Sequence, residues 1–272
     1  MKLANKVAIV TGTSPNIGGG IAECLAAAGA AVVCVDANPA NADDAARYLS
    51  STGARALAIA CDVCDETQVK AAVAATVEHF GGVDILINNA AKFNRKGVLD
   101  MPVAQWRAQV DVILTGAFLF TQHSARAMID GARRGSIVNI ISTAGHQGEP
   151  RNVAYSTAKC GLINFTRSIA MELADKGIRA NSLTPTATDP SESFERAVRW
   201  GRPAADGSAI LAVMESFRQR VPLQKLPVPT DYGRAAVFLC SEDAGMITGT
   251  DLRVDAGAVA RYWAWDPTMP MR

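Results

Sequence analysis

The segment TGTSPNIGGG, Thr11 to Gly20, follows the apolar run VAIV and precedes the helix-like run IAECLAAAGA. A strand, a glycine-bearing turn and a helix in this order can bind the pyrophosphate of a dinucleotide. The N–H groups and the dipole of the helix start attract anionic oxygens there. Gly12 allows the tight turn, and Gly18 allows close approach to the helix start. A glycine pattern alone is weak, so an ordinary strand-to-helix turn remains the alternative.

The middle of this segment holds Asn16 where a glycine would be expected. Asparagine is among the residues that best tolerate a positive φ, so we expect the turn to keep its shape. Pro15 fixes its own φ and stiffens the loop. The Asn16 side chain is also able to donate a hydrogen bond to a phosphate or ribose oxygen. These features favour a working phosphate cradle.

The composition fits one α/β domain with a wide sheet and a large core, because 49% of the 272 residues are hydrophobic. A formal net charge of +1 argues against nucleic acid or an acidic membrane surface as a partner. The sequence shows neither an apolar run of membrane-spanning length nor a signal peptide, so a cytoplasmic protein is expected. The 6 cysteines and 3 histidines lack a ligand spacing, so no metal site is predicted.

Apolar runs typical of strands alternate with alanine-rich helical periodicity along the chain. This alternation predicts an α/β fold with a parallel sheet that helices cover on both faces. Neither a repeat nor a linker divides the chain, so a single domain over residues 1–272 is predicted. The predicted strands are 6–12, 30–36, 54–62, 83–90, 135–142, 178–185 and 251–257, and the predicted helices are 17–29, 40–52, 66–80, 103–130, 152–175 and 231–240.

Residues 186–230 interrupt this alternation with several prolines, scattered charges and no strand pattern. They follow the end of a predicted strand, where open α/β sheets bind ligands. We therefore interpret the segment as a helical, partly mobile lid over the substrate. A surface insertion without a role is the alternative. Its arginines, Arg196, Arg199 and Arg202, are candidates for an anion site, although charged loop residues are usually solvated.

Asp36 ends the second predicted strand, in VVCVDANP. A carboxylate at this place accepts hydrogen bonds from both adenosine ribose hydroxyls and repels a 2′-phosphate. Residues 13–17 and 36–40 contain no Arg or Lys to bind such a phosphate. The sequence therefore favours NAD over NADP, and a solvated turn aspartate is the alternative.

Tyr155 and Lys159 lie four residues apart in a predicted helix, so both side chains share one face. A phenol normally has a pKa of about 10, and a neighbouring ammonium lowers it. Tyr155 would then exchange a proton with an alcohol or ketone oxygen, and Ser142 would hold the same oxygen by a hydrogen bond. Taken alone, this spacing is common, and a core tyrosine beside a surface lysine is the more usual reading.

The combination of motifs is far more specific. From about residue 5 to residue 258 the sequence resembles the short-chain dehydrogenases/reductases. The motifs that carry this resemblance, in their order along the chain, are TGTSPNIG (11–18), CDV (61–63), NNAA (88–91), Ser142, YSTAK (155–159) and RANSLTP (179–185).

The resemblance implies a seven-stranded Rossmann-type doubly wound sheet, an NAD cofactor and a homotetramer or homodimer. It implies that Tyr155 is the general acid/base, that Lys159 binds the nicotinamide ribose and lowers the tyrosine pKa, and that Ser142 positions the substrate oxygen. The predicted cofactor-binding residues include those of the phosphate turn, which are Gly12, Ser14, Asn16, Ile17 and Gly18, together with Asp36. Asp62 and Val63 are expected at the adenine, and Asn89 and Ala90 beside the adenosine ribose. Tyr155 and Lys159 are also expected to contact the cofactor, with Pro185 and Thr188 at the nicotinamide carboxamide.

Three residues depart from the family pattern: Asn16, Thr186 and Ile113. Thr186 stands where the family usually has a glycine. Ile113 stands where the family commonly has an asparagine that anchors a water between the lysine and solvent. The Ile113 side chain cannot form a hydrogen bond. Its backbone carbonyl could replace that asparagine if a local helix irregularity frees it, and we expect a slower or rerouted proton relay. Alternatively, Ile113 only packs in the core.

The sequence thus predicts an NAD-dependent oxidoreductase that interconverts a secondary alcohol and its ketone. The alternatives are a 3-ketoacyl-type carbonyl reductase, which Asp36 disfavours, and a catalytically weak NAD(H)-binding sensor or scaffold, which only Ile113 supports. A small or cyclic apolar alcohol is the expected substrate, and His146, Phe93 and Trp200 are among the candidate pocket residues.

The C-terminal tail, residues 259–272, is rich in aromatic residues. Tyr262, Trp263 and Trp265 are unusual in a solvated chain end. We expect the tail to complete an oligomer interface or to cover a neighbouring subunit's active site. A tail folded onto its own subunit is the alternative.

Overall fold

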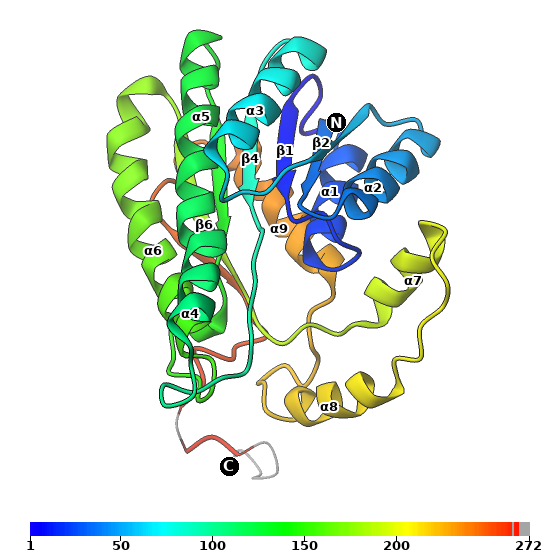
Figure 1. The fold of residues 1–272 in the computed structure, drawn as a ribbon, viewed down its shortest axis with the longest axis vertical. Helices are drawn as coiled ribbons and strands as arrows, with labels where there is room; N and C mark the ends of the chain where they lie inside the picture. The colour runs from blue at the N-terminus through cyan, green and yellow to red at the C-terminus, as the bar shows by residue number, and fades with distance from the viewer. Residues whose placement is uncertain (263, 267–272) are drawn as a thin grey trace.

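Seven strands pair in parallel into one sheet with the order β3-β2-β1-β4-β5-β6-β7 in the computed structural model, which describes residues 1–262 and 264–266 (Figure 1). All seven coincide with predicted strands, so the doubly wound, Rossmann-type prediction is confirmed. The strands are β1 (Val7–Thr11), β2 (Ala31–Asp36), β3 (Ala56–Ala60), β4 (Ile85–Asn88), β5 (Ser136–Ile140), β6 (Arg179–Pro185) and β7 (Asp251–Val254).

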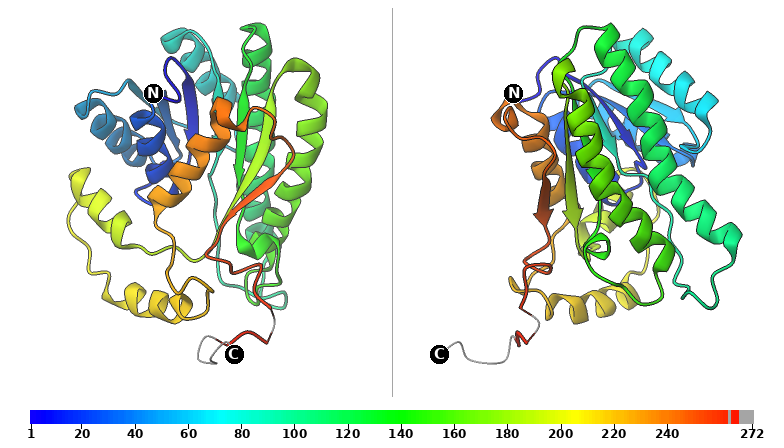
Figure 2. Two further views of the ribbon diagram at one scale, coloured as in Figure 1. Left: turned by 180° about the vertical axis from the view of Figure 1, so that it is seen from behind. Right: turned by 90° about the vertical axis from the view of Figure 1, so that its left-hand side faces the viewer.

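Helices cover both faces of the sheet (Figure 2). A π-helical turn, η1 (Asp111–Thr115), divides the single helix predicted for 103–130 into two. The helices are α1 (Ile17–Ala27), α2 (Pro39–Ser51), α3 (Glu66–Phe80), α4 (Val103–Val110), α5 (Gly116–Asp130), α6 (Val153–Leu173), α7 (Ser191–Arg199), α8 (Ser208–Arg218) and α9 (Pro229–Cys240), with short 3₁₀ turns η2 (Thr143–Gly145), η3 (Ala174–Lys176) and η4 (Glu242–Ala244).

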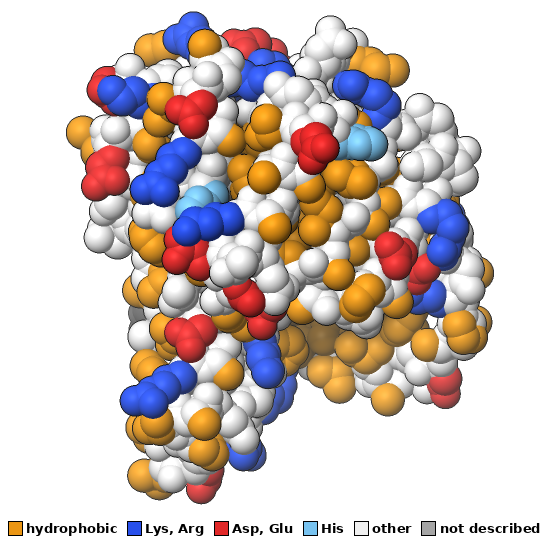
Figure 3. All heavy atoms as spheres, turned by 45° about the horizontal axis from the view of Figure 1, so that its top comes forward, with side chains coloured by type: hydrophobic (Ala, Val, Ile, Leu, Met, Phe, Trp, Pro, Cys, Tyr) orange, Lys and Arg blue, Asp and Glu red, His pale blue; other side chains and the backbone are white. Residues whose placement is uncertain are grey.

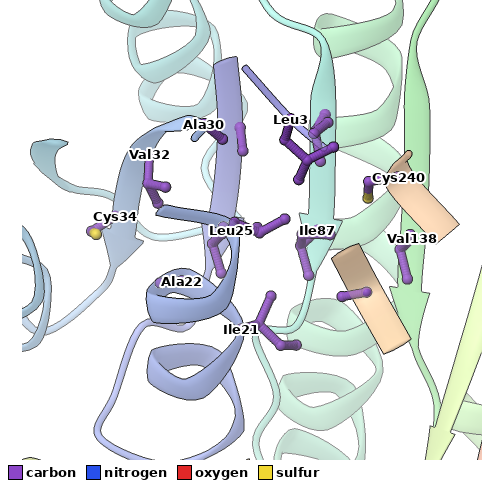
Figure 4. Packing of buried hydrophobic residues seen from close by; sticks show 14 of the residues in the cluster. Leu3, Ile21, Ala22, Leu25, Ala30, Val32, Cys34, Ile87, Val138 and Cys240 are labelled. Atoms are coloured by element: carbon purple, nitrogen blue, oxygen red, sulfur yellow. The ribbon is translucent and has the colours of Figure 1, made fainter. Parts of the chain in front are cut away.

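The strand sequences explain the two layers, because successive side chains point to opposite faces of a sheet. Ala8 and Val10 of β1 join the core beneath α1, α2 and α9, whereas Ile9 joins the core beneath α3, α5 and α6. Both faces of the sheet are buried, so Val7 to Val10 of β1 and Ile85 to Ile87 of β4 are continuous apolar runs. Figure 4 shows part of the first core, where Ile21 and Leu25 of α1 pack toward the sheet.

The carboxyl ends of the strands point downward in Figure 1, and α4, α7 and α8 lie around that edge. The helical character predicted for residues 186–230 is confirmed by α7 and α8. Of the predicted tail, Trp263 and residues 267–272 lie outside the described residues.

Charges of both signs are interspersed on the face that Figure 3 shows. No helix among the described residues is long and apolar enough to cross a membrane.

Candidate active site

Three predicted catalytic residues come together beyond the carboxyl end of β5. Ser142 begins the turn η2, where its Oγ accepts a hydrogen bond of 3.1 Å from the Ala144 N–H. Tyr155 and Lys159 lie one turn apart on α6, with the Lys159 Nζ 5.6 Å from the centre of the Tyr155 ring. The Ser142 side chain also lies close enough to the Tyr155 phenol for hydrogen bonding to lower the pKa of that phenol. The Ala144 N–H occupies one of the two acceptor lone pairs of the Ser142 hydroxyl, and the hydroxyl hydrogen can still be donated.

Burial shifts the two ionisable groups in opposite directions. Burial raises the pKa of Tyr155, and the hydrogen bond from Ser142 partly opposes that change. Burial lowers the pKa of Lys159 to about 7. The Lys159 ammonium donates a hydrogen bond of 2.6 Å to the Ile140 carbonyl and is 2% exposed. In the cofactor-free protein, burial therefore disfavours the charged form of each of these two groups.

The Tyr155 ring forms one wall of this site together with Phe93. The two ring centres are 5.9 Å apart in an edge-to-face arrangement, and Phe93 is 61% exposed. Phe93 was among the predicted pocket residues, and the structure places it beside the reacting group.

Glycines shape the predicted phosphate turn. Gly12 has a φ of +73°, and a Cβ there would lie 2.9 Å from the Cα of Ala90. A Cβ on Gly18 would lie 2.0 Å from the Gly12 carbonyl oxygen. The Asn89 side chain ties this turn to β4 by donating to the carbonyls of Thr11 and Gly12, at 3.0 and 2.9 Å. Both glycines are thus required by close backbone contacts.

Asn16 is tolerated for a different reason from the one that the sequence suggested. Its φ is −89° and its ψ −138°, so the residue lies outside the left-handed region, and the expected need for a positive φ is wrong. Its side chain does not cap α1; its Oδ1 accepts a hydrogen bond of 3.3 Å from the Ser193 hydroxyl of α7. Within the described chain no hydrogen bond reaches the N–H groups of Ile17 and Gly18. These two donors are available for an anionic ligand.

The predicted adenosine residues follow β2 and β3. One oxygen of Asp36 accepts a hydrogen bond of 2.9 Å from the Asn38 N–H, and no salt bridge engages Asp36 within the described residues. Asp62 accepts similarly from the Cys64 N–H, at 2.9 Å. Val63 is buried and packs closely against Gly116, where a Cβ would lie 2.6 Å from its side chain. Asp36 therefore keeps an acceptor oxygen that no cation neutralises.

Pro185 and Thr188, the residues predicted at the nicotinamide, lie at and just beyond the end of β6. The Thr188 hydroxyl lies 3.2 Å from the Thr186 carbonyl and 3.1 Å from the Tyr232 hydroxyl. Thr186 is not among the described residues with a positive φ, so the chain does not require a glycine there. Ser14, another predicted contact, accepts a hydrogen bond of 2.9 Å from Gly19 through its carbonyl.

Two predicted pocket residues face elsewhere. The His146 Nε2 lies 3.0 Å from the Thr184 hydroxyl and 3.2 Å from Asp251, so the ring anchors the turn after Ser142 to β6 and β7. Trp200 is 2% exposed and packs against α1 at Gly19. The sequence missed Thr184 and Asp251 because contacts between distant strands leave no local pattern.

The π turn η1 carries Ile113, the residue that replaces the family's asparagine. Its side chain is 1% exposed, in a cluster with Ala117, Ile141 and Leu162. Gly116 donates its N–H to the Asp111 carbonyl, which is the wider spacing of a π turn. A helix irregularity, which a carbonyl-based relay needs, is therefore present at this position.

The site residues fit a dinucleotide by their donor set and their placement. The Ile17 and Gly18 N–H groups, the Asp36 carboxylate and the Tyr155–Lys159 pair lie beyond the carboxyl ends of β1, β2 and β5. In a parallel sheet these ends share one edge, the usual place for such a ligand.

Known proteins resemble this chain in sequence and in fold. A family described as Enoyl-(Acyl carrier protein) reductase matches residues 12–259. A cis-4-hydroxycyclohexanecarboxylate dehydrogenase from Sinomonas cyclohexanicum is 38% identical over 258 residues, which cover 94% of this chain and 98% of that protein. A 3-oxoacyl-(acyl-carrier-protein) reductase from Aquifex aeolicus is 35% identical, with the same coverage of the two chains. The crystal structure of a short-chain type dehydrogenase/reductase from Mycobacterium marinum matches with a TM-score of 0.83 at 29% identity, and covers 96% of this chain and 97% of that one.

Proposed function

Because this chain belongs to the short-chain dehydrogenase/reductase family and is an oxidoreductase acting on CH–OH donors, we propose that it interconverts a secondary alcohol and its ketone with NAD. The observation that carries the proposal is the position of Tyr155, whose phenol lies beside Ser142 and whose ring centre lies 5.6 Å from the Lys159 Nζ. A phenol between a hydroxyl donor and a cation is suited to transfer a proton to or from a substrate oxygen.

Tyr155, Ser142 and Lys159 each have a different role in the proposed reaction. Bound nicotinamide supplies the hydride chemistry. Tyr155 takes the proton of the alcohol in the oxidative direction and returns it in the reductive direction. Ser142 donates its hydroxyl hydrogen to the same oxygen, while the Ala144 N–H holds the Ser142 Oγ in place. The Lys159 cation stabilises the phenolate that forms when Tyr155 gives up its proton.

We assign the cofactor contacts in the same way. The free N–H groups of Ile17 and Gly18 would bind the pyrophosphate, and Asp36 would accept hydrogen bonds from the adenosine ribose. The unpaired charge of Asp36 supports NAD, since a 2′-phosphate would meet a carboxylate without a cation. Asp62 and Val63 would contact the adenine, with Asn89 and Ala90 beside the ribose. Pro185 and Thr188 would lie at the carboxamide.

Cofactor reduction in wild type and Tyr155→Phe tests this proposal. The enzyme is given NAD or NADP and a panel of secondary alcohols that includes cyclic hydroxy acids. We expect turnover with NAD, and a loss of at least about a hundredfold in kcat for Tyr155→Phe, the usual contribution of a positioned acid/base. Tyr48→Phe, on α2 and outside the site, is the matched control and should keep wild-type turnover.

Two other outcomes would replace the proposal. Turnover only with NADPH and a 3-oxoacyl thioester would identify a ketoacyl-type reductase, the activity named for one relative. Tight NADH binding without turnover on either panel would favour the sensor alternative. The cytoplasmic location remains a prediction.

A further inference from the structure

Arg196 of α7 is fully buried, which is unusual for an arginine. Its Nη1 donates a hydrogen bond of 3.1 Å to the carbonyl of Pro15, inside the phosphate turn. Its Nε lies 3.1 Å from Glu23 of α1, and its Nη2 lies 2.7 Å from Glu192 of α7. One guanidinium therefore joins the turn, the helix that follows it and a segment far along the sequence.

A second contact joins α7 to the next residue of the same turn, because Ser193 donates its hydroxyl hydrogen to Asn16. Beyond the turn, α1 and the end of α7 also pack closely. A Cβ on Gly19 would lie 2.8 Å from the Trp200 ring, and the Trp200 Nε1 donates to Glu23 at 3.2 Å. Figure 1 shows α7 beside α1 and α2, on the opposite side of the molecule from α4 and α6.

The charges of this cluster are balanced within the protein. Glu23 pairs with both Arg196 and Arg199, and Arg202 pairs with Asp44 at 2.7 Å. The three arginines are thus already neutralised, which argues against the anion site considered from the sequence. A buried guanidinium with several fixed acceptors holds its neighbours in one geometry, because moving it away would leave charges unpaired.

The second helix of residues 186–230, α8, is far less buried than α7. No residue of α8 is buried, and its Ile210, Leu211 and Val213 are between 43% and 52% exposed. Its Met214 and Phe217 are the residues that pack against a small cluster around Val221. Few buried contacts mean a low cost of local opening.

We propose that Arg196 is a positioning residue for the pyrophosphate-binding turn: α7 is a fixed support of that turn, and only α8 with its flanking loops moves as the lid. The inference rests on the proposed function, because it assigns the turn to a dinucleotide. Residues 15 and 16 immediately precede the free N–H groups of Ile17 and Gly18. Because Arg196 and Ser193 already hold the turn, its N–H donors can bind the cofactor without a loss of conformational entropy for ordering the turn.

Cofactor binding to Arg196→Lys tests the proposal. Lysine keeps the positive charge between Glu23 and Glu192, but its single ammonium cannot replace a fork that reaches three partners. We expect the Kd for NADH, measured by fluorescence, to rise about three- to tenfold. The Kd for ADP-ribose should rise by the same factor. The Kd for adenosine, which lacks the pyrophosphate, should stay unchanged, whereas a general loss of structure would weaken all three.

Arg199→Lys is the matched control, because Arg199 lies on the same helix and pairs with the same Glu23 but is not bonded to the turn. Its NADH Kd should equal that of wild type. An unchanged NADH Kd in Arg196→Lys, or an equal loss for adenosine, would overturn the proposal.

Hydrogen exchange in the wild-type protein tests the same idea without a substitution. In the cofactor-free protein, the amides of α7 should be protected and those of α8 should exchange quickly. Equal exchange in the two helices would contradict a fixed α7. Failure of wild type to bind NADH or NADPH would instead refute the proposed function, and the exchange result would still decide whether α7 is fixed.

Discussion

At the scale of single residues, the site depends on groups that burial moves away from their ordinary ionisation. Lys159 is buried beside the Ile140 carbonyl, and its pKa is lowered to about 7. The pKa of Tyr155 is raised, mainly by burial. Burial disfavours the charged form of each group when it stands alone. The two charges attract each other, so an ammonium on Lys159 stabilises the phenolate that Tyr155 becomes when it loses its proton.

Replacing Lys159 with methionine should reveal the cost of that burial. Burial lowers the pKa of Lys159 in the folded chain from its ordinary value of 10.5 to about 7, so the unfolded chain binds more protons than the folded chain between these two pH values. The contribution of Lys159 to the free energy of unfolding therefore rises with pH in this range, by at most about 1.4 kcal/mol per pH unit. Lys159→Met should remove this slope and lose turnover. Urea unfolding between pH 7 and pH 9 measures how the free energy of unfolding changes with pH in both proteins.

The exposed Lys176, which pairs with Asp175 on the surface, supplies the control for this experiment. Lys176→Met should keep the wild-type slope. A Lys159→Met protein whose unfolding free energy changes with pH just as in wild type would show that Lys159 keeps an ordinary pKa.

Asp36 should control the choice of cofactor. Asp36→Ala removes the acceptor for the ribose hydroxyls and the repulsion of a 2′-phosphate, so kcat/KM should fall with NAD and rise with NADP. The ratio between them should change by at least about tenfold. Asp43→Ala, an exposed acidic change on the following helix, should leave the ratio unaltered. Loss of activity with both cofactors equally would mean that Asp36 has a structural role.

At the scale of elements, the π turn η1 is the feature that the periodicity of 103–130 did not predict. The spacing of apolar residues shows which face of a helix is buried. One extra residue in a single helical turn changes this spacing little, so the π turn leaves no clear pattern in the sequence. The turn places Ile113 in an apolar cluster against α6, the helix that carries Tyr155 and Lys159. We propose that a backbone carbonyl freed in η1 replaces the side-chain amide of the family's asparagine.

Ile113→Asn tests that proposal. The new amide would be buried among Ala117, Ile141, Ala158 and Leu162, so the free energy of unfolding should fall by roughly 1–3 kcal/mol. If a carbonyl already serves the relay, kcat should stay within about threefold of wild type. Ile113→Val controls for the change in packing. A large gain in kcat would instead show that wild type lacks a working relay, as the sensor alternative requires.

At the scale of the whole molecule, the parallel sheet gathers the site from residues that lie far apart in the sequence. Gly12, Asp36, Asn89, Ser142 and Pro185 each lie at or beyond the end of a different strand. The strands are parallel, so their carboxyl ends all lie at one edge of the sheet.

The assembly of the chain is the remaining prediction at this scale. We propose a homotetramer or homodimer in which the C-terminal tail contributes to the interface or to a neighbouring site. Deleting residues 262–272 should lower the oligomeric mass in light scattering or alter kcat/KM. An unchanged mass with unchanged kinetics would leave the tail on its own subunit. A conservative Tyr262→Phe variant controls for the loss of a single hydroxyl.

The sequence by itself determined the strands and the order of most helices, and it predicts the catalytic group. Strand and helix periodicities are local, and YSTAK with Ser142 is a dense chemical pattern. Only the tertiary structure decided how Asn16 is accommodated, where His146 points and what Arg196 binds. The partners of these side chains, Ser193, Asp251 and Glu23, come from segments that no local pattern connects. Buried polar contacts form between elements only after the sheet has fixed their distances, so these contacts are properties of the folded chain.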